Sequence, residues 1–323
     1  MVTDHLGVGS QLHTLVPLFQ RWAPVQNTVS IVIPHFGDPE PTIALIDQLT
    51  NQTKQVVEII VVDDASPVPL PDQPRATVIR RTANGGFGAT CNTGARAAEG
   101  ELLLFLNSDL EVPADFVEKL TDRAAPWQPC VAGPRIVDSG GINGSARHFP
   151  TIGHQVMEWL VPLARFHGTR WMSERIGHDT RVVTGSTPGV TDWVVGAAML
   201  IPRSEFLSIG GFDEEYYMNC EEVDLQLRLN REHIPAVYIP DTSVTHVGGG
   251  SSPSTRRAFW VAAARNRYAE KWGHPNLLAL ALTSATVVNF GWNCIRRIRN
   301  GAVRPLASAR HELALIRSSV NSH

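Results

Sequence analysis

Cysteine is scarce in this chain of 323 residues, and its four cysteines stand far apart with no CxxC pair. Such isolated cysteines argue against a disulfide scaffold and a structural zinc site, and they indicate a reducing compartment. Net charge is also small, at -3, which gives no reason to expect a nucleic-acid partner. The N-terminus has no basic segment followed by an apolar core, so we expect no secretory signal. An apolar content of 43% with 18% charged residues is instead typical of a globular protein.

One long stretch near the C-terminus lacks formal charge, from Trp272 to Ile295. A membrane-spanning helix needs about 20 predominantly apolar residues. This stretch is long enough, but it contains several Ser, Thr and Asn residues. A helix packed on the protein body and a helix at a membrane surface are equally favoured, and both are favoured over a true span. The basic cluster that follows, Arg296, Arg297 and Arg299, suits an anionic cytoplasmic leaflet.

Short strands rich in Val, Ile and Leu alternate with helical segments in the first half of the chain. Strands are predicted at VSIVIPHF (29–36), VEIIVVDDAS (57–66), ATVIRR (76–81) and LLLFL (102–106), and helices at EPTIALIDQLTNQ (40–52) and GGFGATCNTGARAAEG (85–100). This alternation predicts an α/β fold, a Rossmann-like, mostly parallel sheet with helices on both faces. Further along, TDWVVGAAMLIPR and PAVYIP predict strands, CEEVDLQLRL a helix and VTHVGGGSS a loop.

The expected organisation is an arm over residues 1–28, a globular domain over residues 29–272 and a helical tail over residues 273–323 that is open to membrane-surface association. The domain divides into a first half at about 29–134 and a second half at about 190–272. Between them, region 138–190 is rich in Gly, Ser, His and Arg, with one helical segment near 153–166. Long connections of this kind are often functional, so we expect a mobile excursion.

Polar side chains follow three of the predicted strands, at Pro34-His35, Asp63-Asp64 and Asn107-Ser108-Asp109. In parallel sheets ligands bind beyond the carboxyl ends of the strands, so these side chains should converge on one crevice. Asp109 could instead cap the helix predicted at PADFVEKL, although it lies four residues before Pro113. The functional alternative is that Asp109 binds a hard divalent cation, which prefers oxygen ligands.

Two later segments also carry candidate chemistry. CEEVDL places Glu221, Glu222 and Asp224 at a helix start, where the helix dipole and an Asp224–Arg228 pair explain part of the pattern. Two adjacent carboxylates raise each other's pKa, which suits a general base acting on a hydroxyl. His246, just before Gly248–Gly250, has either a structural role or supplies a nitrogen ligand to a metal.

Seven blocks in order, IVIPHFGD, VVDDAS, NGGFGATCNTG, LLLFLNSDLEV, WVVGAAMLIPR, GGFDEEYYMNCEEVDLQLRL and THVGGGSS, resemble the family 2 glycosyltransferases with the GT-A fold over roughly residues 29–272. The rhamnosyltransferase-like branch is the nearest match. The resemblance implies an inverting transferase that uses a nucleotide-diphospho-sugar donor and Mg²⁺ or Mn²⁺. It also implies a glycan or lipid-linked glycan acceptor, with dTDP-rhamnose as the donor by analogy to the branch, and a location in the cytoplasm at the inner face of the cell membrane.

The same resemblance assigns roles to particular residues. Asn107-Ser108-Asp109 matches the DxD motif with Asn in first place, so metal binding would rest on Asp109, completed by His246. Glu222 stands where the family has its catalytic Asp, and Glu221 remains an alternative base. The implied donor-binding residues are Pro34, His35, Asp64, Gly86, Asn107 and Ser108, in the first half of the domain, and the implied acceptor-binding residues are Trp193, Gly196 and Asp224, in the second half.

Other functions fit the sequence less well. A sugar nucleotidyltransferase would need a Gly-rich loop with Arg and Lys directly after the first strand, and IPHFGDPEP lacks one. An inactive nucleotide-sugar-binding protein would not need the intact acidic pair. A NAD(P)-dependent enzyme would need the GxGxxG fingerprint after the first strand, which is absent.

Overall fold

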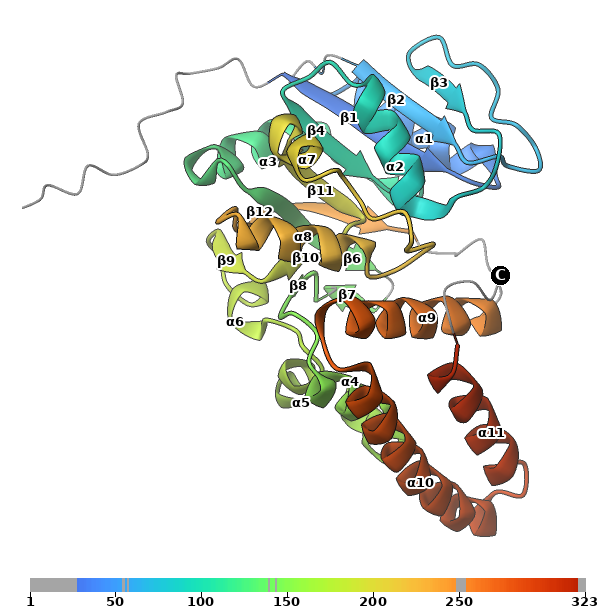
Figure 1. Ribbon diagram of the computed structural model, residues 1–323. Helices are drawn as coiled ribbons and strands as arrows, with labels where there is room; N and C mark the ends of the chain where they lie inside the picture. The colour runs from blue at the N-terminus through green and yellow to red at the C-terminus, as the bar shows by residue number, and fades with distance from the viewer. Residues whose placement is uncertain are drawn as a thin grey trace, which may run out of the picture.

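A mixed β-sheet forms the centre of the molecule (Figure 1), with the strand order β3-β2-β1-β4-β11-β6-β12-β5. The computed structural model describes residues 28–53, 56, 58–138, 140–142, 144–247 and 254–318. Nearly all of the predicted N-terminal arm and the three glycines after Val247 lie outside the described residues.

The first half of the sheet is parallel, as the sequence predicts. Its strands are β1 (Val29–His35), β2 (Glu58–Asp63), β3 (Thr77–Arg80) and β4 (Leu102–Leu106). Helices α1 (Pro39–Thr50) and α2 (Gly86–Ala97) lie between them in the chain. All five residues of β4 are buried, because helices cover both faces of the sheet at this strand.

The second half of the sheet mixes strand directions. Its strands are β5 (Leu110–Glu111), β6 (Val131–Asp138), β7 (Gly141–Ile142), β9 (Gly189–Thr191), β11 (Ala198–Pro202) and β12 (Ala236–His246), and β8 (Ala146–Arg147) pairs with β10 (Trp193–Val194) in a separate ribbon. β11 runs antiparallel to both β4 and β6, whereas β12 is parallel to β6. The helices of this half are α3 (Phe116–Ala124), the 3-10 turn η1 (Ala125–Trp127), α7 (Arg203–Ser208) and α8 (Glu221–Arg231).

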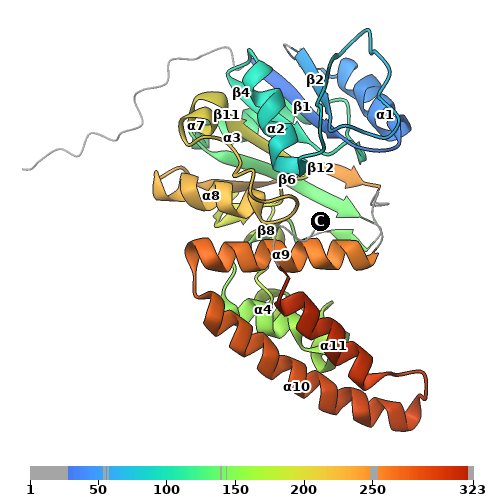
Figure 2. The same ribbon diagram turned by 45° about the vertical axis from the view of Figure 1, so that its right-hand side comes forward.

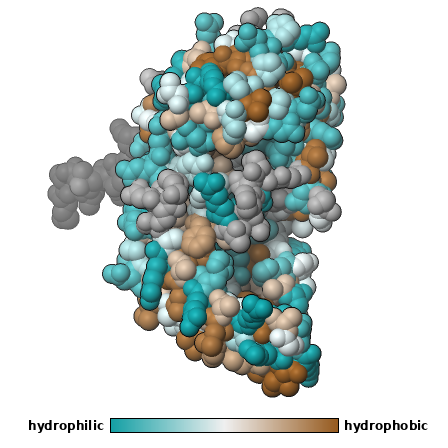
Figure 3. Space-filling view, turned by 90° about the vertical axis from the view of Figure 1, so that its right-hand side faces the viewer, coloured by the Kyte–Doolittle hydropathy of each residue, from teal (hydrophilic) through white to brown (hydrophobic). Residues whose placement is uncertain are grey.

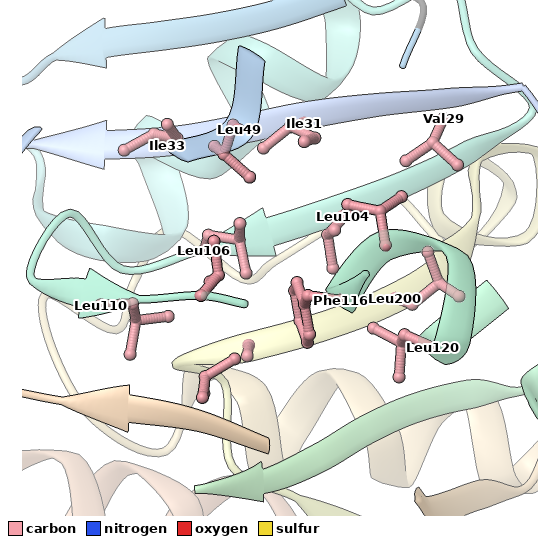
Figure 4. Close-up of a cluster of buried hydrophobic side chains, with 14 of the residues drawn as sticks. Val29, Ile31, Ile33, Leu49, Leu104, Leu106, Leu110, Phe116, Leu120 and Leu200 are labelled. Atoms are coloured by element: carbon pink, nitrogen blue, oxygen red, sulfur yellow. The ribbon is translucent and has the colours of Figure 1, made fainter. Parts of the chain in front are cut away.

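The core has two layers, one on each face of the sheet. Along β1 and β4 successive side chains alternate between the layers, as the period of a strand requires. One layer packs the sheet against α1 and α3 and includes Leu49, Phe116 and Leu120 (Figure 4). The other packs it against α2, α7 and α8. Burying both faces fixes the strand register, since a shift by one residue would move every side chain to the wrong layer.

Region 138–190 is built from short elements. Besides β7 and β8 it contains α4 (Ile152–Trp159), the 3-10 segment η2 (Val161–Phe166), α5 (Arg170–Arg175) and α6 (Thr180–Val183). The helical segment predicted near 153–166 therefore corresponds to α4 and η2. Both contact the C-terminal helices, so this segment joins the sheet region to the tail.

Three helices end the described chain: α9 (Ser254–Trp272), α10 (Pro275–Arg299) and α11 (Pro305–Ile316). In both ribbon views α9 lies beside the sheet region, and α10 and α11 form a hairpin that extends away from it (Figures 1 and 2). Within the described residues, α10 is the one helix long and apolar enough to cross a membrane by length and composition.

Candidate active site

The sheet topology brings the predicted polar segments to one edge. Because β2, β1 and β4 are parallel, the residues after Asp63, His35 and Leu106 leave the sheet at the same edge. β12 points the same way as β4, so its last residue, His246, also reaches this edge. β11 runs in the opposite direction and therefore begins there, just after Ala197. This is the convergence that the carboxyl ends of a parallel sheet predict.

Asp109 and His246 face each other at this edge. Oδ1 of Asp109 lies 3.1 Å from Nε2 of His246, although 137 residues separate them in the chain. The short strand β5 creates this contact, because it pairs with the end of β12 and sets His246 opposite Leu110. This hydrogen bond raises the pKa of His246. For Asp109, burial acts to raise the pKa, but the bond to His246 outweighs it and the pKa is lowered.

Two local expectations change around this pair. The helix-cap alternative for Asp109 does not hold, because α3 begins at Phe116 and the residue at its N-cap position is Asp115. His246 is the last residue of an 11-residue strand, whereas the sequence predicts a loop from Val244 onward. Pairing with β5 extends the strand, and this is a long-range contact that local propensity does not report.

The adjacent acids Glu221 and Glu222 point to different neighbours. Glu221 is 4% exposed, and its Cβ lies 3.6 Å from where a Cβ on Gly88 of α2 would be. Glu222 is only partly buried, and its Cβ lies 3.1 Å from where a Cβ on Gly196 would be. Since Gly196 precedes β11 at the site edge, the side chain of Glu222 packs against that edge and the side chain of Glu221 packs against α2.

Helix α8 is held in this position by contacts that the sequence does not reveal. One turn after Glu222, the amide of Gln226 accepts from the backbone N–H of Val194 at 2.8 Å and donates to its carbonyl at 2.7 Å. The helix begins after two left-handed residues, Asn219 (φ 71) and Cys220 (φ 64). Such conformations are costly for residues with a Cβ and often occur at functional sites.

The carboxylates of Glu221 and Glu222 are both prone to hold a proton. Burial raises the pKa of each above the usual range of glutamate, and for Glu221 the charge of Glu222 raises it further. The charge of Arg147 partly offsets the rise for Glu222. One oxygen of each carboxylate, Oε2, is buried and has no hydrogen-bond partner in the structure. An unsatisfied carboxylate with a raised pKa is a suitable proton acceptor.

Arg147 is a site residue that sequence reasoning missed. It lies on β8 opposite Trp193 of β10, and its guanidinium sits 5.6 Å from the centre of the Trp193 ring. The indole N–H of Trp193 donates to the carbonyl of His148 at 2.9 Å. An arginine within the Gly- and Ser-rich region 138–190 gave no signal of its own, since only the folded chain brings β8 beside α8 and β10.

Asp224 does not occupy the predicted acceptor-binding position. Its side chain is fully buried, and its oxygens contact Arg228 at 2.8 Å, Lys271 at 2.7 Å and the indole nitrogen of Trp272 at 2.7 Å. The ion pair with Arg228 is the structural alternative that the spacing of four residues predicts. Asp224 therefore ties α8 to the end of α9, and neither carboxylate oxygen remains for an acceptor.

Asp64, predicted to bind the donor, holds the glycine loop before α2. Its carboxylate accepts from the backbone N–H of Gly85 at 3.0 Å and of Gly86 at 2.8 Å, and it contacts Arg81. Gly86 has φ 83, and a Cβ there would lie 1.8 Å from the carbonyl oxygen of Tyr217. The N–H of Gly86 is thus directed to Asp64, and the glycine permits close packing of the loop around Tyr217.

The ends of β1 and β4 supply the remaining predicted donor residues. Nδ1 of His35 lies 2.8 Å from the hydroxyl of Thr42, while its buried Nε2 has no partner, and burial lowers the pKa of His35. Pro34 is partly exposed, as are Asn107 and Ser108, and the backbone N–H of Asn107 donates to Ala197 at 2.8 Å. That bond joins the turn after β4 to the entry of β11.

A divalent cation would find two protein ligands at this edge. Among the described residues, no three His, Cys, Asp or Glu side chains are grouped as a metal cluster. A low-pKa carboxylate on Asp109 beside the imidazole of His246 still fits a hard cation that takes its other ligands from phosphate oxygens and water. The donor set is that of an open site rather than a closed structural one.

Comparison with known proteins agrees with this geometry. Residues 30–182 match the family described as "Glycosyl transferase family 2". The chain contains a family 2 glycosyltransferase domain. This glycosyltransferase domain match includes Asp64 and Asp109 but ends before Glu222 and His246, so the placement of the last two comes from the fold.

The curated relatives of this glycosyltransferase include rhamnosyltransferases. It is 28% identical over 220 residues to the N-acetylglucosaminyl-diphospho-decaprenol L-rhamnosyltransferase of Mycobacterium tuberculosis, covering 61% of this chain and 69% of that protein. It is 29% identical over 175 residues to the rhamnosyltransferase WbbL of Escherichia coli, covering 50% and 60%. Among solved structures, GalNAc-T7 with UDP, GalNAc and Mn²⁺ aligns with a TM-score of 0.57 at 15% identity, covering 78% of this chain and 49% of that one. This likeness confirms the GT-A fold.

Proposed function

We propose that this glycosyltransferase moves a sugar from a nucleotide-diphosphate donor to a hydroxyl of its acceptor by a single, inverting displacement. Two observations support the proposal: Asp109 and His246 pair at one sheet edge, and Glu222 packs beside Gly196 at the entry of β11 with its buried Oε2 unpartnered among the described residues. An inverting transfer needs one proton acceptor and a way to neutralise charge on the leaving diphosphate. Both requirements are met by residues from distant parts of the chain.

In this mechanism Glu222 takes the proton of the acceptor hydroxyl at its Oε2 atom. Burial raises the pKa of Glu222, which makes its carboxylate a better base, and the charge of Arg147 opposes part of that rise. Gly196 leaves space next to Glu222, because a side chain there would approach the Cβ of Glu222 to 3.1 Å. The ring of Trp193 is buried, at 8% exposed, with the guanidinium of Arg147 over it, so it would support the acceptor side of the site from beneath rather than contact the sugar.

Asp109 and His246 would hold Mg²⁺ or Mn²⁺. When bound, the cation supplies Lewis-acid neutralisation of the diphosphate, worth several kcal/mol in general. Mn²⁺ accompanies UDP in the GalNAc-T7 structure, which shares the fold, and this supports divalent metal use here. The lowered pKa of Asp109 favours its carboxylate, the form that binds a cation, and His246 would bind the cation as the neutral imidazole.

On the donor side, we propose that Pro34, His35, Asn107 and Ser108 line the nucleotide at the ends of β1 and β4. Burial lowers the pKa of His35, which favours the neutral imidazole, and its buried Nε2 has no hydrogen-bond partner among the described residues. Asp64 contributes through the loop it fixes, since its oxygens already accept from Gly85 and Gly86. A donor that displaced these bonds would bind the same carboxylate directly.

The named relatives suggest the substrates. Two are rhamnosyltransferases, and one is named for an acceptor built on a diphospho-decaprenol lipid. We therefore propose dTDP-rhamnose as donor and a glycan or lipid-linked glycan as acceptor, with the enzyme in the cytoplasm at the inner face of the cell membrane. All four cysteines are free thiols, in keeping with a reducing compartment.

A panel of nucleotide sugars tests this proposal directly. The melting temperature should rise with one donor of the panel, and only when Mg²⁺ or Mn²⁺ is present. A ligand at a hundred times its Kd stabilises the folded protein by about 2.7 kcal/mol, which sets the size of the expected rise. Asp109→Ala should abolish this metal-dependent rise and leave the melting temperature without ligand near that of the parent. A variant that binds donor as tightly as the parent and ignores the metal would contradict the assignment of Asp109.

A further inference from the structure

The face of α10 that packs against the protein includes three polar side chains beside Leu278, Leu282 and Ala285. Thr286, Asn289 and Asn293 are all buried. Thr286 accepts from the indole N–H of Trp159 at 3.0 Å. Asn289 accepts from the N–H of Val161 at 2.8 Å and donates to the carbonyl of Trp159 at 2.9 Å. A helix on the surface of a globular protein normally has the opposite arrangement, with polar residues facing water.

The opposite face of α10 is exposed and mostly apolar, with Ser284 and Gly291 between its large side chains. The exposed fractions are 52% for Leu277, 64% for Leu280, 67% for Val287, 55% for Val288, 56% for Ile295 and 86% for Ile298. These positions recur at helical spacing, so they form one stripe on one face. Leu306, at the start of α11, adds a further exposed apolar side chain (64%) beyond the turn. The space-filling view shows hydrophobic atoms gathered at this end of the molecule (Figure 3).

Positive charge gathers at the end of this apolar stripe. Arg296, Arg297, Arg299 and Arg304 are all exposed, and they surround the turn between α10 and α11. The sequence from Gly273 to His311 contains no Asp or Glu. A surface with an apolar stripe and basic residues at one end is complementary to a bilayer interface that carries anionic headgroups.

We propose that α10 lies in the plane of an anionic membrane surface, with its Leu277–Ile298 stripe in contact with lipid and the arginines at the headgroups. A transmembrane orientation of α10 would break the hydrogen bonds of Thr286 and Asn289 and place these groups in hydrocarbon, where each unsatisfied group is costly. A second copy of the chain is a poorer partner, because its own α10 and the turn into α11 carry no Asp or Glu that could pair with the arginines. This docking surface goes beyond the transfer reaction and does not depend on it.

Vesicle flotation with the full chain tests the proposal. Binding should be strong to vesicles that contain about 30% phosphatidylglycerol, and much weaker to pure phosphatidylcholine or in about 0.5 M salt. The triple variant Arg296→Gln, Arg297→Gln, Arg299→Gln should lose affinity by roughly a hundredfold, at about 1 kcal/mol for each arginine. Arg75→Gln, Arg96→Gln, Arg123→Gln, a matched set of exposed arginines elsewhere, should bind like the parent.

The apolar stripe is tested separately. Leu280→Ser, Val287→Ser, Ile298→Ser should prevent binding even to anionic vesicles, whereas Val68→Ser with Val190→Ser, which also replaces exposed valines, should not. A fluorophore on Cys294, an exposed cysteine of α10, should shift to shorter wavelength when vesicles are added, and Cys294→Ser gives the background. The triple serine variant of α10 and the Val68→Ser, Val190→Ser control should both keep the parent's melting temperature, because the replaced side chains do not pack in the core.

Three outcomes would overturn the proposal. The first is no binding to either vesicle type. The second is that alkaline carbonate fails to release the protein from membranes, which would indicate a spanning helix. The third is a dimer in solution that the serine variant converts to a monomer while vesicle binding is unchanged, which would assign the stripe to self-association. None of these outcomes bears on transfer activity, so the proposed reaction and this surface can fail independently.

Discussion

Replacing Glu222 with Gln removes a negative charge and a proton acceptor while keeping the size of the side chain. In the structure Oε2 of Glu222 makes no hydrogen bond, so the substitution breaks no bond at that atom. Burial raises the pKa of Glu222, which means that the folded protein holds the ionised form at a cost that glutamine does not carry. We therefore expect Glu222→Gln to fold as well as the parent.

Activity should respond very differently. Loss of a general base lowers the rate by about 10² to 10⁴, or about 2.7 to 5.4 kcal/mol in the activation free energy. The loss should appear in kcat, with donor affinity nearly unchanged, because Asp109 and His246 come from other elements of the fold. The measurement is release of nucleoside diphosphate with a saturating donor, together with a metal-dependent thermal shift for donor binding.

Glu221→Gln is the matched control, because it makes the same chemical change one residue away. The Cβ of Glu221 faces Gly88 in the first turn of α2, whereas that of Glu222 faces Gly196 before β11, so we expect the Glu221 variant to keep most of the parent activity. If Glu222→Gln were fully active and Glu221→Gln inactive, the base would be Glu221 and the inference from packing would be wrong. If both lost donor binding, neither could be assigned as the base.

Three further predictions address the loop, the pH dependence and the helix anchor. Gly86→Ala should destabilise the fold by at least about 2 kcal/mol, because Gly86 has a positive φ and an added Cβ would collide with the carbonyl oxygen of Tyr217. Gly85→Ala is the control, since a Cβ there meets only the flexible end of Arg81. Equal melting temperatures for the two variants would contradict this prediction. Arg147→Gln should move the acid limb of the pH–rate profile to higher pH, because the charge of Arg147 lowers the pKa of Glu222. An acid limb at the same pH as in the parent would show that Arg147 does not act on the catalytic base. Asp224→Asn should lower the free energy of unfolding by about 3 kcal/mol, measured with a denaturant, because it leaves Arg228 of α8 and Lys271 of α9 without their carboxylate partner. A change below about 0.5 kcal/mol would show that Asp224 does not hold α8 to α9.

The pH dependence of stability provides a separate check on the acidic pair. Because burial and the charge of Glu222 hold the pKa of Glu221 above its unfolded value, the parent is stabilised at low pH and loses that stability as pH rises through the folded pKa. Glu221→Gln cannot ionise. Its melting temperature relative to the parent should therefore increase with pH, and a constant difference from pH 5 to 8 would contradict the raised pKa.

The positions that the sequence predicted correctly are those where one local pattern decides the structure. Continuous apolar runs predicted β1, β2 and β4, and their parallel arrangement predicted that the polar residues after them share one edge of the sheet. The helix α8 was predicted from its spacing, including the Asp224–Arg228 pair. In each case neighbours within a few residues supply the determining interactions.

The remaining features depend on contacts between distant segments. No local pattern distinguishes Glu221 from Glu222, and the difference appears only when α2 packs against one and Gly196 against the other. Arg147 gave no signal because β8 must first pair with β10. Asp224 looked available in sequence until α9 returned to pair with it.

By itself, then, the sequence determined the strand order along the chain, the identity of the polar turn residues and the apolar, uncharged character of the segment before the C-terminal arginines. Only the tertiary structure decided that β5 brings Asp109 to His246, and that Thr286, Asn289 and Asn293 of α10 face inward while the Leu277–Ile298 stripe faces out. The physical reason is that the repeat of side chains along a helix or strand determines which residues share a face. Which other segment packs against that face depends on the folding of the whole chain.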